Sequence, residues 1–369
     1  MKNKAVHKRL MLVLLIPLGY LLLYLSSLSH PLTENIYSKG LYKALSIPLN
    51  ILFGYIPVSV AEIILISTVL ILLFLIVRTI IRIIKSPSEK WSILGRAISN
   101  IVAAASILYL SFILLWGFNY QRLPFKDIAG YDTQPTDINT LKHVCEALIQ
   151  RTNELRTQVD ENIDGIMKLS GGINDTLKRA HMGYNNIESK YPELTYKFGR
   201  PKGVLLSEVM SYLGIGGVYF PFTTEANVNI SLPSTSLPFT ACHEMAHQIG
   251  FSREDEANYI AYLACKFHPD HDFQYSGTLS AMIYATNALY QYSPEDYFEL
   301  REKFSDGVAR DVKASNNYWE KYETKIQDFS SSINNAYLKA NMQNDGVRSY
   351  GRMVDLLIAE YLKGLAANG

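Results

Sequence analysis

Five consecutive residues, His243-Glu244-Met245-Ala246-His247, form the pattern His-Glu-x-x-His. In a helix, residues four apart share a face, so both imidazoles can bind one metal ion. Glu244 then lies beside the open coordination position and can take a proton from a water bound to the metal. Zinc lowers the pKa of such a water toward about 7. The motif therefore predicts a zinc site with Glu244 as the general base.

The neighbouring residues predict the two helices that must position these side chains. Residues 238–240, Pro-Phe-Thr, are typical of a helix start and Gly250 of a helix stop, which places the motif on one short helix. Ser252 and Asp255 resemble a capping box, so a second helix is expected to begin near Arg253. The alternative reading is a helix with two exposed histidines and an ion-pairing glutamate, which would hold no metal.

A zinc site needs a third protein ligand, and two acids in the expected second helix compete for that role. Glu254 and Asn258 are four residues apart and share a helix face, so Glu254 can bind the metal while Asn258 orients a histidine ligand. Glu256 points roughly 160° away from Glu254 on an ideal helix. We therefore favour Glu254 and keep Glu256 as the alternative. Both acids could instead form a solvated first turn, which the helix dipole favours.

The chain has 369 residues, 48% of them apolar, and a formal net charge of +1. Nucleic-acid-binding proteins carry a basic excess that this chain lacks, and three scattered cysteines are too few for a disulfide scaffold. Long uncharged runs predict three membrane-spanning helices, at about 9–29, 59–80 and 98–118. We therefore divide the chain into a membrane domain, 1–121, and a domain of ordinary size, 122–369.

Lysine and arginine set the expected orientation of these spans. Basic residues precede the first span, and the loop between the second and third spans carries Arg82, Lys85, Lys90 and Arg96. The positive-inside rule places both segments in the cytoplasm, so residues 122–369 lie outside it and the protein is a multi-pass component of the cytoplasmic (inner) membrane. Glu62, at the start of the second span, is expected to cap that helix at the outer interface rather than act within the membrane.

The remaining sequence predicts a mostly helical α+β domain. Helical spacing of apolar residues indicates helices over 137–159 and 175–189, and a final amphipathic helix over 349–365. Residues 218–230 are rich in β-branched and aromatic residues and read as a strand. Ser293, followed by Pro and two acids, is a helix N-cap. The fold class is therefore mainly α, with three amino-terminal transmembrane helices.

Taken together, His243-Glu244-x-x-His247 and the pair Glu254 and Asn258 resemble the zincin metallopeptidases. In the branch with a glutamate ligand, the gluzincins, a second helix supplies the glutamate, followed four residues later by Asp or Asn. The resemblance implies a zincin-like domain in which His243, His247 and Glu254 bind Zn²⁺. It also implies that Glu244 is the general base and that Asn258 takes the place of the usual Asp.

The spacing departs from that branch, because only six residues separate the second histidine from Glu254. Gly250 lies where the metzincins turn sharply, but Arg253 stands at the position of their third histidine. The whole chain also resembles an uncharacterised family of bacterial membrane proteins known only as a domain of unknown function. Residues 116–120, Trp-Gly-Phe-Asn-Tyr, and 239–244, Phe-Thr-Ala-Cys-His-Glu, carry this second resemblance.

Three further features could contribute to a site. Tyr219–Asn229 could pair with an extended substrate as an edge strand, or could be a buried strand and turn. His268 and His271 are expected in a loop rather than in a second metal site. The segment Tyr337–Leu357 could supply an oxyanion-stabilising group, although ordinary surface polarity is the favoured reading; its polar members are Asn341, Arg348, Tyr350 and Arg352.

The sequence thus predicts a membrane-anchored zinc-dependent hydrolase, a metallopeptidase whose partners are the lipid bilayer and an unidentified peptide or protein substrate, not nucleic acid. A second hypothesis is a non-catalytic, membrane-anchored sensor or scaffold that keeps the metal. A third is an interaction protein in which the motif is coincidental. Cys242 and Cys265 fit either a disulfide outside the cytoplasm or two buried thiols.

Overall fold

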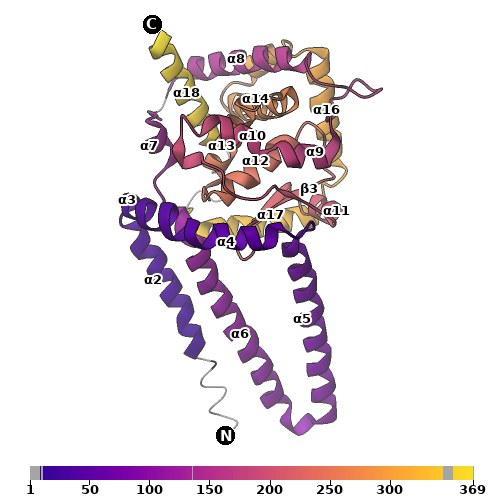
Figure 1. Ribbon diagram of the computed structural model, residues 1–369. Helices are drawn as coiled ribbons and strands as arrows, with labels where there is room; N and C mark the ends of the chain where they lie inside the picture. Colours follow the sequence, from indigo (N-terminus) through magenta and orange to yellow (C-terminus); the bar gives the residue numbers. More distant parts are fainter. Residues whose placement is uncertain (1–8, 10, 135, 344–351, 369) are drawn as a thin grey trace.

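The computed structural model describes residues 9, 11–134, 136–343 and 352–368. Figure 1 shows a helical head above a stalk, and the stalk is made by the amino-terminal helices α2 (Leu15–Ser27), α5 (Val60–Lys85) and α6 (Lys90–Leu115). The chain is mainly helical, as expected. Its few strands all lie in the head.

Two stalk helices are long and apolar enough to cross a membrane. They are α5 and the segment Pro87–Leu115, which contains the short 3₁₀ turn η3 (Pro87–Glu89) and α6. The expected spans 59–80 and 98–118 fall largely within them. Both helices extend beyond the uncharged runs. Lys85, Lys90 and Arg96, which were expected in the loop between the two spans, lie within the helices. Lysine and arginine are good helix formers, so their charge does not end a helix.

The first expected span, 9–29, is supported only in part. Leu12–Ser27 is helical but then bends by 103° into His30–Gly54, so the described part of the chain has two candidate spans, or three if this bent pair counts as one. Ser29 has an extended backbone, and Pro31 follows as one of the first residues of the next helix. Proline has no N–H to donate to a preceding turn. The bend thus follows from the local sequence.

Residues 42–54, for which no element was expected, form the helix α4 (Tyr42–Gly54) after the short α3 (His30–Leu32) and the π-helical η2 (Thr33–Leu41). Figure 1 shows α4 lying across the top of the stalk, beneath the head. Its buried residues Tyr42, Ser46 and Asn50 are four apart and share the face toward the head. The Asn50 amide donates to the carbonyl of Thr224 over 2.7 Å. This part of the predicted membrane domain therefore packs against the head.

The head is built from helices around a small sheet. Its elements are η4 (Gly117–Gln121), α7 (Phe125–Ala129), α8 (Ile138–Arg156), α9 (Gly172–Arg179), α10 (His181–Ile187), η5 (Pro192–Leu194), β1 (Lys202–Val204), α11 (Ser207–Tyr212), β2 (Gly217–Phe220), β3 (Glu225–Asn229), α12 (Leu237–Gln248), α13 (Glu254–Lys266), α14 (His271–Tyr292), α15 (Pro294–Arg301), α16 (Asp306–Glu320), α17 (Lys325–Ala340) and α18 (Met353–Asn368). Helices α8, α12, α13 and α14 pack on one another and form most of the buried core.

Most of the helices expected in the head are present. Asp137 caps α8, and Ser293 caps α15 by accepting from the backbone of Asp296. The helix expected over 175–189 is two helices, α9 and α10, joined at Ala180. The final helix, α18, begins at Met353; the first part of its expected range, 349–351, lies outside the described residues.

The sheet has the strand order β1-β3-β2, with β1 parallel and β2 antiparallel to the central β3. The single strand expected over 218–230 is therefore two strands joined by a turn. Thr224 in that turn has a φ of 54°, and Pro221 follows directly after β2. Proline is compatible with an edge strand but not with the centre of a sheet. Strand β2 accordingly lies at one edge.

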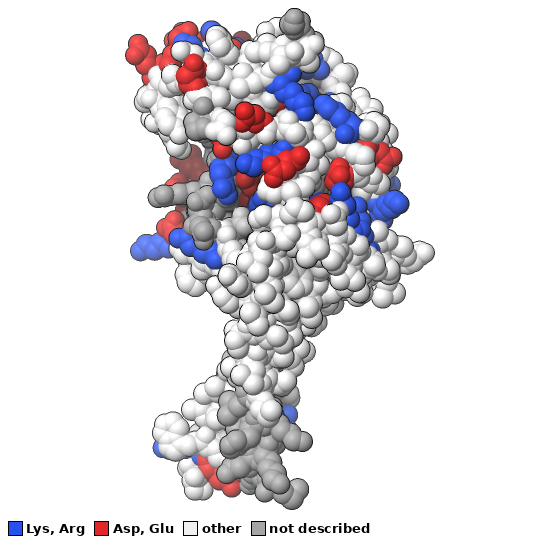
Figure 2. All heavy atoms as spheres, turned by 90° about the vertical axis from the view of Figure 1, so that its left-hand side faces the viewer, with Lys and Arg blue, Asp and Glu red and all other residues white. Residues whose placement is uncertain are grey.

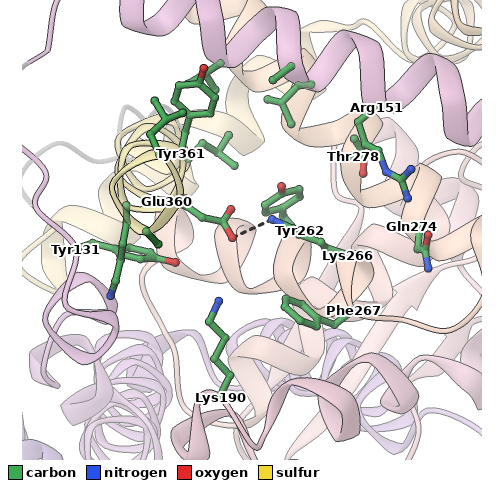
Figure 3. A pocket seen from close by; sticks show the side chains of 18 of the residues that line it. Tyr131, Arg151, Lys190, Tyr262, Lys266, Phe267, Gln274, Thr278, Glu360 and Tyr361 are labelled. Atoms are coloured by element: carbon green, nitrogen blue, oxygen red, sulfur yellow. Dashed lines mark hydrogen bonds and ion pairs between the residues drawn. The ribbon is translucent and has the colours of Figure 1, made fainter. Parts of the chain in front are cut away.

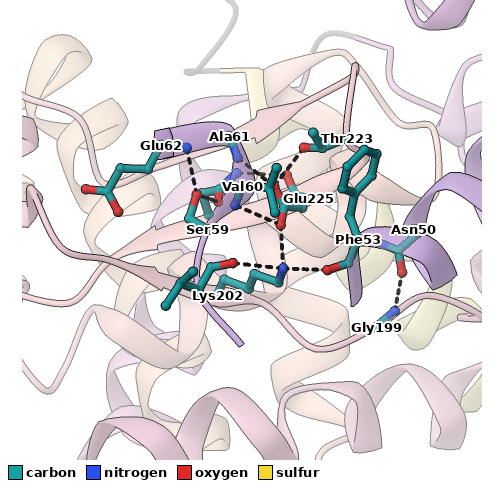
Figure 4. A network of polar contacts seen from close by, with 12 residues as sticks. Asn50, Phe53, Ser59, Val60, Ala61, Glu62, Gly199, Lys202, Thr223 and Glu225 are labelled. Atoms are coloured by element: carbon teal, nitrogen blue, oxygen red, sulfur yellow. Dashed lines mark hydrogen bonds and ion pairs between the residues drawn. The ribbon is translucent and has the colours of Figure 1, made fainter. Parts of the chain in front are cut away.

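A buried polar network joins the sheet to the start of α5 (Figure 4). The Glu225 carboxylate forms an ion pair with Lys202 and accepts hydrogen bonds from the backbone of Val60 and Ala61. Glu62 accepts from the backbone N–H groups of residues 205 and 206, over 3.0 and 2.7 Å. Glu62 lies in the first turn of α5, as expected, but the helix cap is Ser59, so the capping role predicted for Glu62 was wrong: its carboxylate binds the head to the stalk instead.

Candidate functional site

Helices α12 and α13 bring the motif together. Pro238 lies in the first turn of α12, as expected. Gly250 ends the turn after it with a φ of 99°, which a residue with a side chain rarely adopts. The chain then reverses, and α13 packs against α12. The helix break at Gly250 thereby places the first residue of α13 opposite the histidines of α12.

The ring nitrogens of both histidines converge on one carboxylate oxygen. The Nε2 atom of His243 lies 3.3 Å from Glu254 Oε2, and that of His247 lies 3.6 Å from the same oxygen. On the other side of its ring, the Nδ1 of His247 donates to the carbonyl of Phe251 over 2.7 Å. This bond fixes the tautomer that leaves Nε2 free to act as a ligand.

The three side chains have the spacing of ligands to one ion. Among the described residues, one group of three or more His, Cys, Asp or Glu side chains could bind one metal ion. It consists of His243, His247 and Glu254, whose donor atoms all lie within 4.8 Å of one another. Tetrahedral zinc with bonds of about 2.0–2.2 Å sets its ligand atoms about 3.3–3.6 Å apart. The two distances to Glu254 agree with this value, so the residues fit a zinc ion.

Electrostatics at the cluster favour a cation. Burial would lower the pKa of His247, but the Glu254 carboxylate beside it raises that pKa to about 9. Burial would raise the pKa of Glu254, but the imidazoles of His247 and His243 hold it well below its ordinary value. The carboxylate therefore stays ionised and faces two imidazoles whose free nitrogens attract a proton or a metal ion.

Glu244 lies beside this cluster but is not part of it. Its side chain is 3% exposed, and its Oε2 atom has no hydrogen-bond partner within the described part of the chain. It packs against the edge strand, where the backbone of Tyr219 forms a hydrogen bond with its carboxylate. Burial raises the pKa of Glu244, and the two nearby histidines lower it by less. A buried carboxylate with a raised pKa is suited to exchanging a proton near neutral pH.

The structure separates the two acids that the sequence left as alternatives. Glu256 points away from the cluster, where it accepts from the backbone of Phe125 over 2.8 Å and pairs with Arg253. The expected capping box is wrong, because α13 begins at Glu254 without a side-chain cap. The hydroxyl of Ser252 is buried without a partner among the described residues. The position of the helix start was nevertheless right.

Asn258 lines the same cavity as the cluster but does not orient a histidine. The described residues contain no hydrogen bond from Asn258 to His243 or His247, and its side chain interacts with the hydroxyl of Tyr284. The carbonyl of Phe251 holds His247 instead. A backbone acceptor of this kind leaves no signature in the sequence.

The cluster opens into a cavity of about 770 Å³ between the sheet edge and α17. Several aromatic residues that the sequence did not assign to the site line it: Trp116, Tyr120, Tyr284 and Tyr337. Trp116 and Tyr120 belong to the segment 116–120, on which the resemblance of the whole chain to an uncharacterised family was based. That resemblance was the one feature of the sequence that could have pointed to these two residues. Tyr337 is the first residue of the segment weighed for an oxyanion role.

The other described residues considered in the sequence are not among those that line the cavity. Arg352 lies 3.7 Å from Asp255, and Arg348 and Tyr350 lie outside the described residues. Asn341 is buried and donates to the carbonyl of Tyr337. His268 stacks on Phe273 with ring centroids 3.8 Å apart, as a buried structural histidine. Three cysteines are free and buried, which favours thiols over a disulfide: Cys145, Cys242 and Cys265.

A second cavity, of about 870 Å³, lies between α8, α13 and α18 (Figure 3). It shares no lining residue with the cavity at the cluster. The lysines that line it contact nearby carboxylates or aromatic rings. The Nζ of Lys266 lies 3.0 Å from Glu360 Oε1, and the Nζ of Lys190 lies 5.3 Å from the ring centroid of Tyr191. Because it contains neither the histidines nor Glu244, the larger cavity is not the candidate active site.

The fold and the cluster describe a mainly helical chain with candidate membrane spans and a metal-type site in its head. The chain belongs to the family described as "Protein of unknown function (DUF3810)", whose family model matches residues 37–358. The resemblance to an uncharacterised family is thereby confirmed, whereas the comparisons do not point to the zincins. No curated protein and no solved structure shows significant similarity to the chain.

Proposed function

We propose that the protein is a membrane-anchored zinc-dependent hydrolase, and specifically a metallopeptidase. The observation that carries the proposal is the convergence of His243, His247 and Glu254, with donor atoms within 4.8 Å of one another, beside a buried carboxylate that is not a ligand. Bound zinc would polarise a scissile carbonyl and supply hydroxide at neutral pH. All other steps fall to residues of the chain.

Glu244 is the group that moves protons. It lies next to the two histidines in sequence and in space, is buried, and has a raised pKa. As general base it takes a proton from the attacking water, and as general acid it hands that proton to the leaving amine nitrogen. A purely structural metal site or scaffold gains nothing from a buried carboxylate whose Oε2 has no hydrogen-bond partner among the described residues, because such a group lowers stability.

The edge strand β2 favours a peptide over other amides. Gly216 accepts a ladder bond from Asn229, so the alternation of an antiparallel pair turns the backbone groups of Gly217 and Tyr219 toward the free edge. That edge lines the cavity at the cluster. An extended peptide can add to such an edge through its main chain.

The distribution of Lys and Arg supports a head that lies outside the cytoplasm.

The test is a cleavage assay with a denatured proteome-derived peptide mixture and the full-length protein reconstituted with zinc. Mass spectrometry of the new peptide ends reads out cleavage. We expect new ends with the wild type and none with Glu244→Gln, which keeps all three ligands and therefore its zinc. If the zinc-loaded protein gives no new peptide ends, the hydrolase hypothesis is excluded. The hypothesis of a metal-binding sensor or scaffold would then remain.

A further inference from the structure

The metal-type cluster lies at the end of a candidate membrane span. Trp116 directly follows α6, and its ring centroid lies 4.6 Å from that of Tyr219 and 6.1 Å from that of His247. Four residues later, the hydroxyl of Tyr120 donates to that of Tyr337 over 3.0 Å. One wall of the cavity is therefore made by the chain as it leaves the stalk.

Helix α17 covers the cavity and presents an exposed apolar stripe beside its cavity-lining face, with Ile333 at the border of the two. Ile326, Phe329 and Ile333 recur at helical spacing, and Phe329 is 68% exposed. The polar residues Ser330 and Asn334 line the cavity. Leu338 is the buried member of the sixteen residues of α17. Its charges lie near its two ends, so the middle of the helix, 329–338, is uncharged.

Helix α4 shows the same division and lies at the same level, between the stalk and the rest of the head (Figure 1). Its polar face bonds to the head through Tyr42 and Asn50, while Leu45 and Leu52 on the other side are exposed. Figure 2 shows that charged side chains end where the head meets the stalk, and that the stalk below is free of charge until its lower end. On this side of the molecule, the uncharged surface at the base of the head is thus continuous with that of the stalk.

We propose that α4 and α17 lie in the bilayer interface, so that the metal site opens at the membrane surface. Its substrate is then a polypeptide held at that surface, namely the segment next to the membrane anchor of another protein. The substrate part rests on the proposed function; the interfacial placement does not. Interfacial helices have this arrangement, with an apolar face in the lipid and a polar face away from it. The rim of the cavity is apolar on both sides, with Val218 on the sheet edge and Ile333 on α17 exposed.

The placement is tested by spin-label accessibility in the full-length protein reconstituted in phosphatidylcholine vesicles. The native cysteines are buried, so a nitroxide reagent reacts with an introduced thiol. Phe329→Cys reports on α17, and Phe298→Cys is the matched control, since Phe298 is 53% exposed on α15, which packs beside α8 away from the stalk. We expect the label at 329 to collide more with oxygen than with a water-soluble nickel complex, and the reverse at 298. Equal, water-like collision ratios at both positions would overturn the placement.

The substrate class is tested with a randomised segment presented in two ways on a transmembrane anchor in the same vesicles. In one form the segment directly follows the anchor, and in the other a helical spacer of about 30 residues holds it about 45 Å away. We expect cleavage of the close form to be at least about 10-fold faster, and abolished by Glu244→Gln. Equal rates would overturn a surface-bound substrate while leaving the hydrolase intact. Cleavage of neither form by zinc-loaded protein would overturn the hydrolase and this substrate, while the spin-label result would still decide the placement.

Discussion

The carboxylate of Glu244 occupies the space that a side chain on Gly217 would fill. A Cβ atom built on Gly217 would lie 2.5 Å from Glu244 Oε1 and 2.6 Å from its Cγ. Because Cβ atoms do not approach other atoms this closely, one of the two must shift. The absence of a side chain on the edge strand is therefore what lets the carboxylate lie between that strand and the two histidines.

The first prediction concerns this contact. Gly217→Ala displaces Glu244 but leaves the three ligands unchanged, so we expect normal zinc content and a loss of hydrolysis of about 100-fold, the effect of a misplacement of about 1 Å. Gly216→Ala is the matched control, because its Cβ would meet nothing closer than 3.5 Å. Peptide cleavage by the two purified variants gives the comparison. Full activity in Gly217→Ala would show that Glu244 is not the base.

A second prediction separates the two acids of α13. Glu254→Gln removes a ligand, and we expect zinc affinity to fall by more than the roughly 10–100-fold seen when groups outside the ligand set are lost. Glu256→Gln should leave zinc affinity unchanged, because that carboxylate bonds to the backbone of Phe125 instead. Competition with a zinc chelator measures both variants. A larger loss in Glu256→Gln than in Glu254→Gln would contradict the ligand assignment.

A third prediction concerns the buried ion pair within the sheet, whose two members also form hydrogen bonds to the backbone around the start of α5. Lys202 and Glu225 are both buried, so Glu225→Gln leaves the Lys202 ammonium without its counter-ion. Removing one partner of a buried pair destabilises a protein by about 3–5 kcal/mol. We expect a lower midpoint of thermal unfolding for the variant in lipid nanodiscs, and partial recovery in the double variant with Lys202→Met. An unchanged midpoint for Glu225→Gln would mean that this pair and its bonds to the stalk contribute little to stability.

A fourth prediction follows from His268, whose pKa burial lowers below its ordinary value. Its Nδ1 accepts from the backbone of Asp270 over 3.0 Å, a bond that protonation removes. The unfolded chain takes up the proton more readily than the folded one, so the folded state loses stability as the pH falls below about 6.5. We expect this decline to be shallower in His268→Gln, measured by denaturation between pH 8 and pH 5. Parallel pH profiles of stability for the wild type and His268→Gln would refute this role of His268.

The local parts of the site could be predicted from the sequence. Four-residue spacing puts His243 and His247 on one face, and the same rule favoured Glu254 over Glu256; the structure agrees in geometry. The caps at Asp137 and Ser293 were also predictable, because a helix start depends on a few adjacent residues. These features involve contacts between residues close in the chain.

The rest depends on contacts between distant parts of the chain. Residues 42–54 have no charged face that would mark α4 as interfacial, since Ser46 and Asn50 are its polar surface. Trp116 reaches His247 only because α6 ends beneath α12, and no periodicity in the sequence encodes that meeting. Likewise, the backbone carbonyl that holds His247 could have been supplied by any residue. Such contacts are set by tertiary packing, which a single sequence does not display.

The proposed function depends on the binding of one zinc ion by His243, His247 and Glu254. Elemental analysis of the purified full-length protein, beside His247→Ala, measures this binding. We expect about one zinc per chain in the wild type, and loss of that zinc in the variant, because a site left with two ligands binds weakly. If a folded, zinc-supplemented wild type contained no stoichiometric zinc, the three residues would not form a zinc site, and the hypothesis of a membrane-anchored interaction protein would remain.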